Sequence, residues 1–253
     1  MEQYYNDFGT WIRKQLPFRV QKISIDAGFT CPNRDGKIGV GGCIFCDNKS
    51  FNPSYCSHRK SITEQLEDGK HFFAKKYPDM KYLAYFQAYT NTYDKVDKLK
   101  LLYEEALQVK DVVGIVIGTR PDCVSNELLD YLEELNKETF LIVEYGIESC
   151  NDETLHYINR GHNFACTRKA IEKTAERNIY VGGHVIMGLP GEDASESLRQ
   201  APIISSLPLT MLKIHQMQII KGTRLAKIYK EKPFHLYTRS EEHTSELQSR
   251  DSI

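Results

Sequence analysis

The sequence has almost no net charge and no long apolar run. It carries 33 Lys and Arg residues against 34 Asp and Glu residues, a formal charge of −1, so the charge balance indicates neither a nucleic-acid partner nor a membrane surface. No apolar run approaches the ~20 residues that span a bilayer, and the N-terminal stretch MEQYYNDFGTW has no signal-peptide core. We therefore expect a cytoplasmic protein without a membrane segment.

The cysteines do not fit a secreted disulfide framework. There are seven of them, an odd number, and Cys31, Cys43 and Cys46 are bunched in one glycine-rich stretch. That distribution favours reduced thiols and metal ligation. The other cysteines lack a second close spacing, so we expect them to be small buried hydrophobes and not a second cluster. They are Cys56, Cys123, Cys150 and Cys166.

The number of cysteines in that stretch limits the kind of metal centre. Cys43 and Cys46 are two residues apart and can face one centre, and the flexible loop lets Cys31 close on it. Three thiolates suit a 4Fe–4S cluster with one open iron. Structural zinc normally needs four ligands, and Cys56 or His58 could supply the fourth. A zinc-stabilised, non-catalytic binding protein is therefore the alternative to a cluster.

Apolar periodicity predicts strands that alternate with helices. A chain of 253 residues, 41% of them apolar, can form one large domain. Residues 1–19 read as an N-terminal helical segment that ends at Pro17, and residues 20–238 as the core domain. Strands are expected at 20–27, 82–89, 112–117, 140–147, 179–187 and 211–220. Helices are expected at 61–76 (capped by Ser61 or Thr63), 96–109, 125–135 (capped by Ser125), 152–158, 167–177 and 194–206.

This alternation predicts an α/β fold, a partial (β/α)6 TIM-type barrel with parallel strands. In such barrels the active site lies at the carboxyl ends of the strands, and polar residues gather there in this sequence. They are Cys31, Gln87, Thr90, Asn91, Arg120, Asp122, Glu144, Glu148, His184, His215, Gln216 and Gln218.

The last fifteen residues, 239–253, have no apolar periodicity and no aromatic residue. Residues 239–249 resemble the translated read-through of a common sequencing adapter. We therefore expect an artefactual, disordered tail and a core domain that is truncated at its C-terminal side.

Several motifs together resemble the radical S-adenosylmethionine (radical SAM) superfamily. They are the three-cysteine loop with Phe45 before its last cysteine, VEYGIES at 143–149, INRGHN at 158–163 and HVIMGLPGE at 184–192. The resemblance covers roughly residues 1–238, in the branch of Elongator-type tRNA enzymes, methylthiotransferases and oxygen-independent coproporphyrinogen oxidase. The run GFTCPNRDGKIGVGGCIFC is similar to a bacterial YhcC/YtqA-like subfamily. The C-x11-C-x2-C spacing departs from the common CxxxCxxC and matches the longer loops of the Elongator branch.

The resemblance implies an enzyme that reductively cleaves S-adenosylmethionine at a 4Fe–4S cluster held by Cys31, Cys43 and Cys46. The resulting 5′-deoxyadenosyl radical would act on a substrate that the sequence does not identify. A radical methyl- or methylthiotransferase is the alternative. The branch implies a reducing electron donor such as flavodoxin or ferredoxin, and by analogy an RNA substrate, which the charge balance does not support.

The resemblance also assigns contacts to S-adenosylmethionine. Phe45 would pack beside the adenine, Glu148 would contact the ribose, and Arg160 would pair with the carboxylate. The usual glycine-rich turn after the second strand is absent, so Gln87, Thr90 and Asn91 would hold the amino group instead. His184 would face the ribose or the substrate, with a neutral core histidine as the alternative.

Overall fold

The computed structural model describes residues 6–47, 52–74 and 80–237, and these residues contain one sheet of six parallel strands. The strands follow chain order: β1 Val20–Ile25, β2 Lys81–Phe86, β3 Val112–Thr119, β4 Phe140–Glu148, β5 Tyr180–Met187 and β6 Met211–Gln216. The helices are α1 Phe8–Gln15, α2 Ile62–Ala74, α3 Val96–Gln108, α4 Asn126–Glu138, α5 Asp152–Tyr157, α6 Phe164–Ala175, α7 Ala194–Ser205 and α8 Arg224–Glu231, with a 3₁₀ turn, η2, at Pro121–Cys123.

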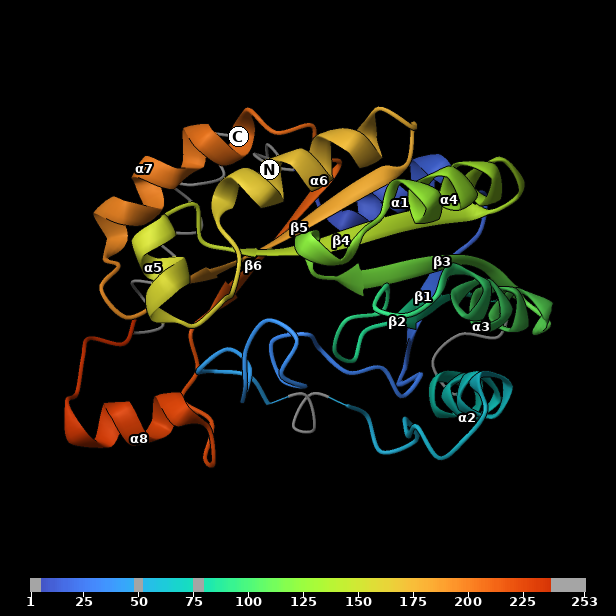
Figure 1. The fold of residues 1–253 in the computed structure, drawn as a ribbon. Coiled ribbons are helices and arrows are strands. Elements are labelled where there is room, and N and C mark those ends of the chain that lie inside the picture. Colours follow the sequence, from blue (N-terminus) through green and yellow to red (C-terminus); the bar gives the residue numbers. More distant parts are fainter. Residues whose placement is uncertain (1–5, 48–51, 75–79, 238–253) are drawn as a thin grey trace.

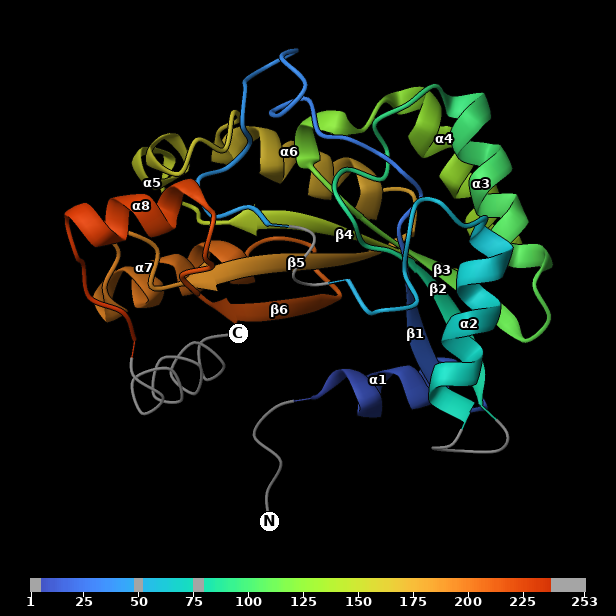
Figure 2. The ribbon, with the colours of Figure 1, turned by 90° about the horizontal axis from the view of Figure 1, so that it is seen from below.

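The sheet curls into a half barrel, which confirms the predicted fold class. The strand order is open, with β1 and β6 as its edges. Helices α4, α6 and α7 line one side of the sheet, while the cysteine loop and α8 lie on the other side in the same view (Figure 1). The view turned by 90° shows the curl of the strands, with α1 beside β1 (Figure 2).

The middle strands are apolar on both faces because both faces are covered. In β3, Ile115, Val116 and Ile117 are fully buried, so the continuous β-branched run belongs to a buried parallel strand. Helix α1 covers the inner face at the amino ends of the strands. Its Trp11 packs edge-on against Tyr180, with ring centroids 5.1 Å apart, and lies 6.1 Å from Phe140.

Helix starts follow the capping residues. Ser61 and Glu64 form a reciprocal capping box: the Glu64 N–H donates to Ser61 Oγ and the Ser61 N–H donates to the Glu64 carboxylate. Ser125 accepts from the Leu128 N–H at the start of α4. Both agree with the predicted caps. Asn163 accepts from the Cys166 N–H, so α6 begins at Phe164, earlier than the predicted residue 167.

Some predicted boundaries were wrong. The strands expected at 20–27, 82–89 and 211–220 end at Ile25, Phe86 and Gln216, and the first helix spans only Phe8–Gln15 because Asp7 caps it. Helix α8 was not predicted. Residues 1–5 and the tail 239–253 lie outside the described residues. Within the described residues, no helix is long and apolar enough to cross a bilayer.

Candidate metal and cofactor site

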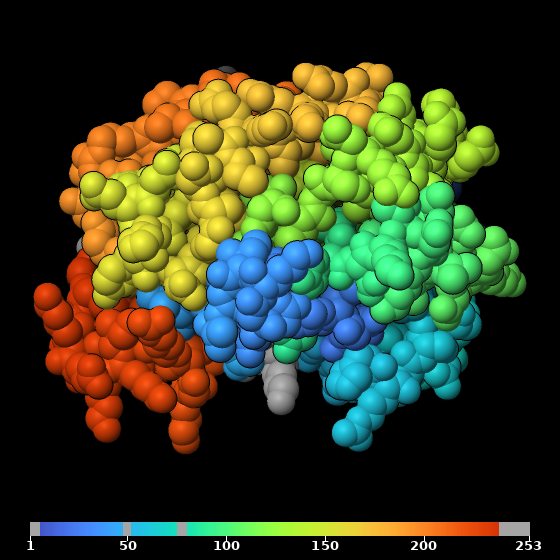
Figure 3. All heavy atoms as spheres, in the orientation of Figure 1, coloured from blue at the N-terminus to red at the C-terminus, as the bar shows by residue number. Residues whose placement is uncertain are grey.

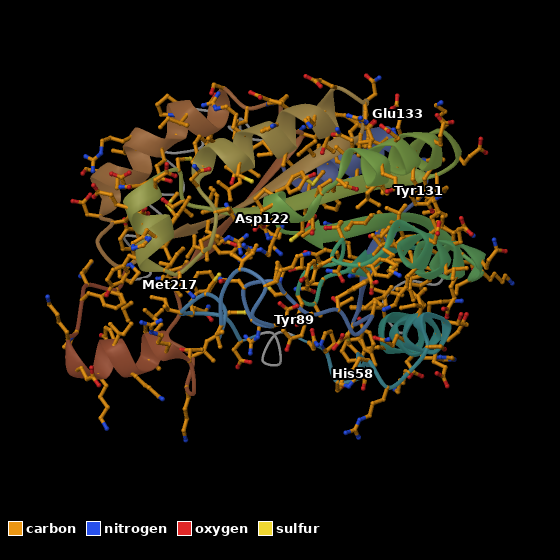
Figure 4. The ribbon with its side chains drawn as sticks, in the orientation of Figure 1. His58, Tyr89, Asp122, Tyr131, Glu133 and Met217 are labelled. Atoms are coloured by element: carbon orange, nitrogen blue, oxygen red, sulfur yellow. The ribbon has the colours of Figure 1, made fainter. Side chains whose placement is uncertain are left out.

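The cysteine loop closes over one cavity at the carboxyl ends of the strands. The cavity has a volume of about 510 Å³, within the range of small-molecule sites. It brings together most of the residues singled out in the sequence: Cys31, Cys43, Phe45, Cys46, Gln87, Thr90, Glu148, Arg160 and His184. Tyr89, Asp122 and Met217, from the segments after β2, β3 and β6, lie around this loop (Figure 4).

Local turns shape the cysteine loop. The Cys31 carbonyl accepts from the Arg34 and Asp35 N–H groups at 2.8 and 3.1 Å, and the Cys43 carbonyl accepts from the Cys46 N–H at 3.0 Å. Asn33 is almost fully buried, and its amide nitrogen lies 3.8 Å from Cys43 Sγ. Two turns and one buried amide therefore position the three thiols.

The INRGHN segment fastens the loop to the barrel. The Ile44 N–H donates to the Ile158 carbonyl at 3.0 Å, and the Asn159 amide donates to the Gly42 carbonyl at 2.8 Å. The Asn33 amide donates in return to the Asn159 carbonyl. This motif, which the sequence suggested only by resemblance, thus holds the cysteine loop in place.

Arg160 reaches from that segment to the thiols. Its Nη1 lies 3.7 Å from Cys43 Sγ, its Nη2 donates to the Gly146 carbonyl at 2.8 Å, and Glu148 lies 3.4 Å away. Its Nε is buried without a hydrogen-bond partner among the described residues. A Cβ at Gly146 would come within 2.6 Å of Arg160 Nη2, so only glycine leaves room for this arrangement.

Glu148 occupies an unusual backbone conformation. Its φ is +64°, and the β4–β5 register shifts between Gly146 and Glu148. A non-glycine residue at positive φ is uncommon, and such strain clusters at functional sites. The shift directs the Glu148 side chain toward Arg160, at the edge of the cavity.

Arg120 is a second buried guanidinium on the cavity wall. It is 3% exposed and donates to both carboxylate oxygens of Asp122, at 2.9 and 2.8 Å, and to the Arg160 carbonyl at 2.8 Å. Its Nη1 has no partner among the described residues. Arg120 therefore presents one fixed, unsatisfied donor close to the cysteine loop.

Arg34 approaches the thiols from the loop itself. Its Nη1 lies 3.6 Å from Cys46 Sγ, and its guanidinium lies 5.7 Å from the centre of the Tyr89 ring. Burial and the neighbouring Cys43 raise the pKa of the Cys46 thiol to about 11. Metal binding at Cys46 would therefore release a proton.

A hydrogen-bonded chain crosses the inner wall. Glu144, 4% exposed, pairs with Lys22 and accepts from His184 Nε2 at 2.9 Å; His184 Nδ1 lies 3.4 Å from His215 Nε2. Burial alone would raise the pKa of Glu144, but the hydrogen bond from His184 and the Lys22 ammonium hold it well below its usual range. Burial, His184 and Lys213 lower the pKa of His215 to about 4, so His215 is neutral at pH 7.

Asn91 does not line the cavity. Its amide nitrogen donates to the Phe86 and Gly118 carbonyls, at 3.0 and 2.7 Å. It therefore ties the ends of β2 and β3 together, while Thr90 and Gln87 remain on the cavity wall.

The described residues offer no obvious fourth zinc ligand. His58 Nδ1 lies 3.9 Å from Asp26, and Cys56 packs in the outer apolar core. Across residues 6–47, 52–74 and 80–237, no group of three or more His, Cys, Asp or Glu side chains is placed to hold a single ion. Three thiols around one cavity, with cationic donors beside them, fit a cluster in which each thiolate binds a different iron.

Sequence reasoning missed several residues of this site. Asn33 and Arg34 lie inside the recognised loop, so their position was a usable signal. Lys22 carried no signal, because its partner Glu144 lies 122 positions away.

Comparisons with known proteins agree with this geometry. The family model of the Radical SAM superfamily matches residues 31–199. The chain is 38% identical over 230 residues to YtqA of Bacillus subtilis (91% of this chain, 71% of YtqA). It is also 38% identical over 230 residues to YhcC of Escherichia coli K12 (90% and 73%). The archaeal Elp3 structure from Methanocaldococcus infernus has a TM-score of 0.68 at 19% identity; the match covers 91% of this chain and spans 53% of that chain.

Proposed function

The chain belongs to the radical SAM superfamily, whose enzymes use a 4Fe–4S cluster and S-adenosylmethionine, and we propose that Cys31, Cys43 and Cys46 hold that cluster here. When bound, the cluster and S-adenosylmethionine supply a 5′-deoxyadenosyl radical by reductive cleavage. The observation that carries the proposal is that all three thiols line the same cavity as the polar residues at the strand ends.

The two buried guanidiniums bind the methionyl carboxylate. Arg160 Nε and Arg120 Nη1 are buried donors without partners among the described residues, and such donors are costly unless a ligand satisfies them. Each guanidinium offers one such charged N–H donor, and a charged donor forms a strong hydrogen bond with a carboxylate. Asp122 fixes the Arg120 fork before the ligand arrives, which limits the entropy lost on binding.

The remaining wall residues orient the cofactor and the substrate. Phe45 is half-buried and packs beside the adenine, and Glu148 accepts from the ribose hydroxyls. Gln87, held by Ser24 Oγ at 2.8 Å, and Thr90 face the amino group. His184, fixed by Glu144, faces the substrate side. Asn91 supports the segment after β2 through its hydrogen bonds to the Phe86 and Gly118 carbonyls.

The rival functions have less support. A zinc-stabilised binding protein needs a closed set of four ligands, and neither Cys56 nor His58 lines the cavity of the three thiols. A radical methyl- or methylthiotransferase uses the same cluster, and methyl transfer leaves S-adenosylhomocysteine as its product. The charge of −1 gives an RNA substrate no independent support, so we propose none.

Anaerobic reconstitution with iron and sulfide tests the proposal. We expect brown protein with about four irons per chain and release of 5′-deoxyadenosine after addition of dithionite and S-adenosylmethionine. Cys43→Ala should lose both. Cys166→Ala is the matched control, because Cys166 is a half-buried cysteine in α6 outside the loop, and it should keep both.

Two results would contradict the proposal. Colourless protein that retains one zinc would support the binding-protein alternative. S-adenosylhomocysteine without 5′-deoxyadenosine would support methyl transfer without hydrogen abstraction.

A further inference from the structure

A cluster of positive charge stands out on a chain that is otherwise nearly neutral. Residues 221–232 contain five basic residues and a single acid, whereas the whole chain has a charge of −1. All five basic side chains are exposed, and none forms an ion pair within the described part of the chain. This basic face consists of Lys221, Arg224, Lys227, Lys230 and Lys232.

Helix α8 holds this basic face rigidly against the cysteine loop. The Leu225 N–H donates to the Ile44 carbonyl at 2.8 Å, and Leu225 is fully buried in one apolar cluster with Ile44 and Ile158. Thr223 caps the helix by accepting from the Ala226 N–H at 3.1 Å. In the space-filling view the red α8 segment borders the blue loop, and its long side chains project away from the molecule (Figure 3).

We propose that the basic face of α8 is the docking surface for an acidic one-electron carrier protein that reduces the cluster. This inference rests on the proposed function, because only a cluster enzyme needs such a partner. Ile44, to which α8 is hydrogen-bonded, lies between Cys43 and Cys46. A carrier that docks on α8 is therefore brought beside the loop that holds the cluster.

The size and charge of the face suit this partner. Redox encounters are small and transient, and a helix of 8 residues with its flanks offers a small surface. Unpaired cations beside the site attract an acidic protein and raise its association rate. The interaction should weaken with salt, because exposed charges are screened.

The same face is poorly built for RNA. Single-stranded RNA is read by bases that stack on aromatic rings. The aromatic residue of α8, Tyr229, already packs edge-on against Phe234, with centroids 5.1 Å apart. Nucleic-acid-binding domains are also usually basic as a whole, whereas the pI of this chain is about 6.7.

A charge reversal on the full chain tests the proposal. The variant is Lys227→Glu with Lys230→Glu, two exposed residues that share one helix face. Its matched control is Lys14→Glu with Lys110→Glu, which makes the same charge change with exposed lysines at the opposite end of the strands. The probe is an acidic flavodoxin, titrated calorimetrically into the cluster-free protein at about 50 mM and about 200 mM salt.

We expect the α8 variant to bind flavodoxin ~10-fold more weakly at low salt, since charge reversal reduces steered association. The control variant should stay within about twofold of the parent. In the reconstituted enzymes, flavodoxin-driven release of 5′-deoxyadenosine should fall only in the α8 variant. Dithionite-driven release should be equal in all three.

Three results would overturn the proposal. They are no flavodoxin binding by the parent protein, equal weakening in both variants, and loss of bulk tRNA binding in the α8 variant with flavodoxin binding intact. Dithionite-driven release of 5′-deoxyadenosine needs the cluster but no docked protein. If that release is intact while flavodoxin fails to bind, the docking proposal fails and the proposed function does not. Far-ultraviolet circular dichroism shows whether the variants remain folded.

Discussion

The interior of the half barrel is apolar at one end and polar at the other. At the amino ends of the strands, Trp11 packs on Phe140 and Tyr180. At the carboxyl ends, Glu144 and His184 belong to a buried hydrogen-bonded chain. The side chains at the apolar end are uncharged, so only the polar end depends on ionisation. We call them the apolar end and the polar end.

In one strand, the apolar end and the polar end are only two residues apart. In β4, Ile142 belongs to the apolar cluster on the inner face, and Glu144 begins the polar chain. Apolar burial stabilises the fold without any partner, whereas a buried carboxylate stabilises it only when it is paired. The apolar end therefore contributes stability that is independent of pH. The polar end holds the side chains of the candidate site in place, and its contribution depends on pH.

The largest effect is expected from Glu144→Gln at the polar end. Removing this charge leaves Lys22 and His184 without their carboxylate, and breaking a buried pair costs about 3 kcal/mol. The pKa of Glu144 is held below its ordinary value of 4.5. Its stabilising contribution is therefore complete above that pH and lost as the pH falls through the lower, folded-state pKa.

Urea unfolding of the parent and Glu144→Gln from pH 7 to pH 3 measures this prediction. The difference in unfolding free energy should be full at pH 7 and should shrink below about pH 4.5. A difference that stays constant across this range would mean that Glu144 acts through packing and not through its charge.

Trp11→Ala should give a smaller, pH-independent loss at the apolar end. Truncating a buried tryptophan costs about 3–5 kcal/mol, and Trp11 is only half-buried, so we expect about 2 kcal/mol. Trp11→Phe is the control, since it keeps a ring against Tyr180 and should cost less. If the Trp11→Ala loss varied with pH as the Glu144→Gln loss does, the two ends would not be independent.

The sequence predicted the parts that depend on local patterns. Apolar runs predicted all six strands and the edge at which the candidate site lies, and the spacing of Cys31, Cys43 and Cys46 predicted the candidate ligands. Capping residues gave the start of α4 at Ser125. These features depend on residues that are close in the chain, so periodicity and spacing are sufficient.

Contacts between residues far apart in the chain were missed. Arg120 meets the Arg160 carbonyl across 40 positions, and that contact requires the strand register, which periodicity does not fix. The two hydrogen bonds from the Asn91 amide nitrogen to the Phe86 and Gly118 carbonyls were not foreseen either, and its predicted contact with the cofactor stays a prediction. Helix α8 was also missed, although its cap, Thr223, and its buried Leu225 are local signals.

The smallest effect on stability is expected from Gly146→Ala at the polar end. The added Cβ would meet Glu148 Oε1 at 2.4 Å and Arg160 Nη2 at 2.6 Å, the flexible tips of two side chains that can move aside. The free energy of unfolding should therefore fall by only about 1 kcal/mol. Arg160 would nevertheless be displaced from Cys43, so binding of S-adenosylmethionine to the reconstituted protein should weaken ~10-fold, as expected for loss of a charged hydrogen bond. Equilibrium dialysis and urea unfolding of the same preparations measure both effects. A general packing defect would lower stability and affinity together. That result would contradict the prediction that Gly146 positions Arg160 with little effect on stability.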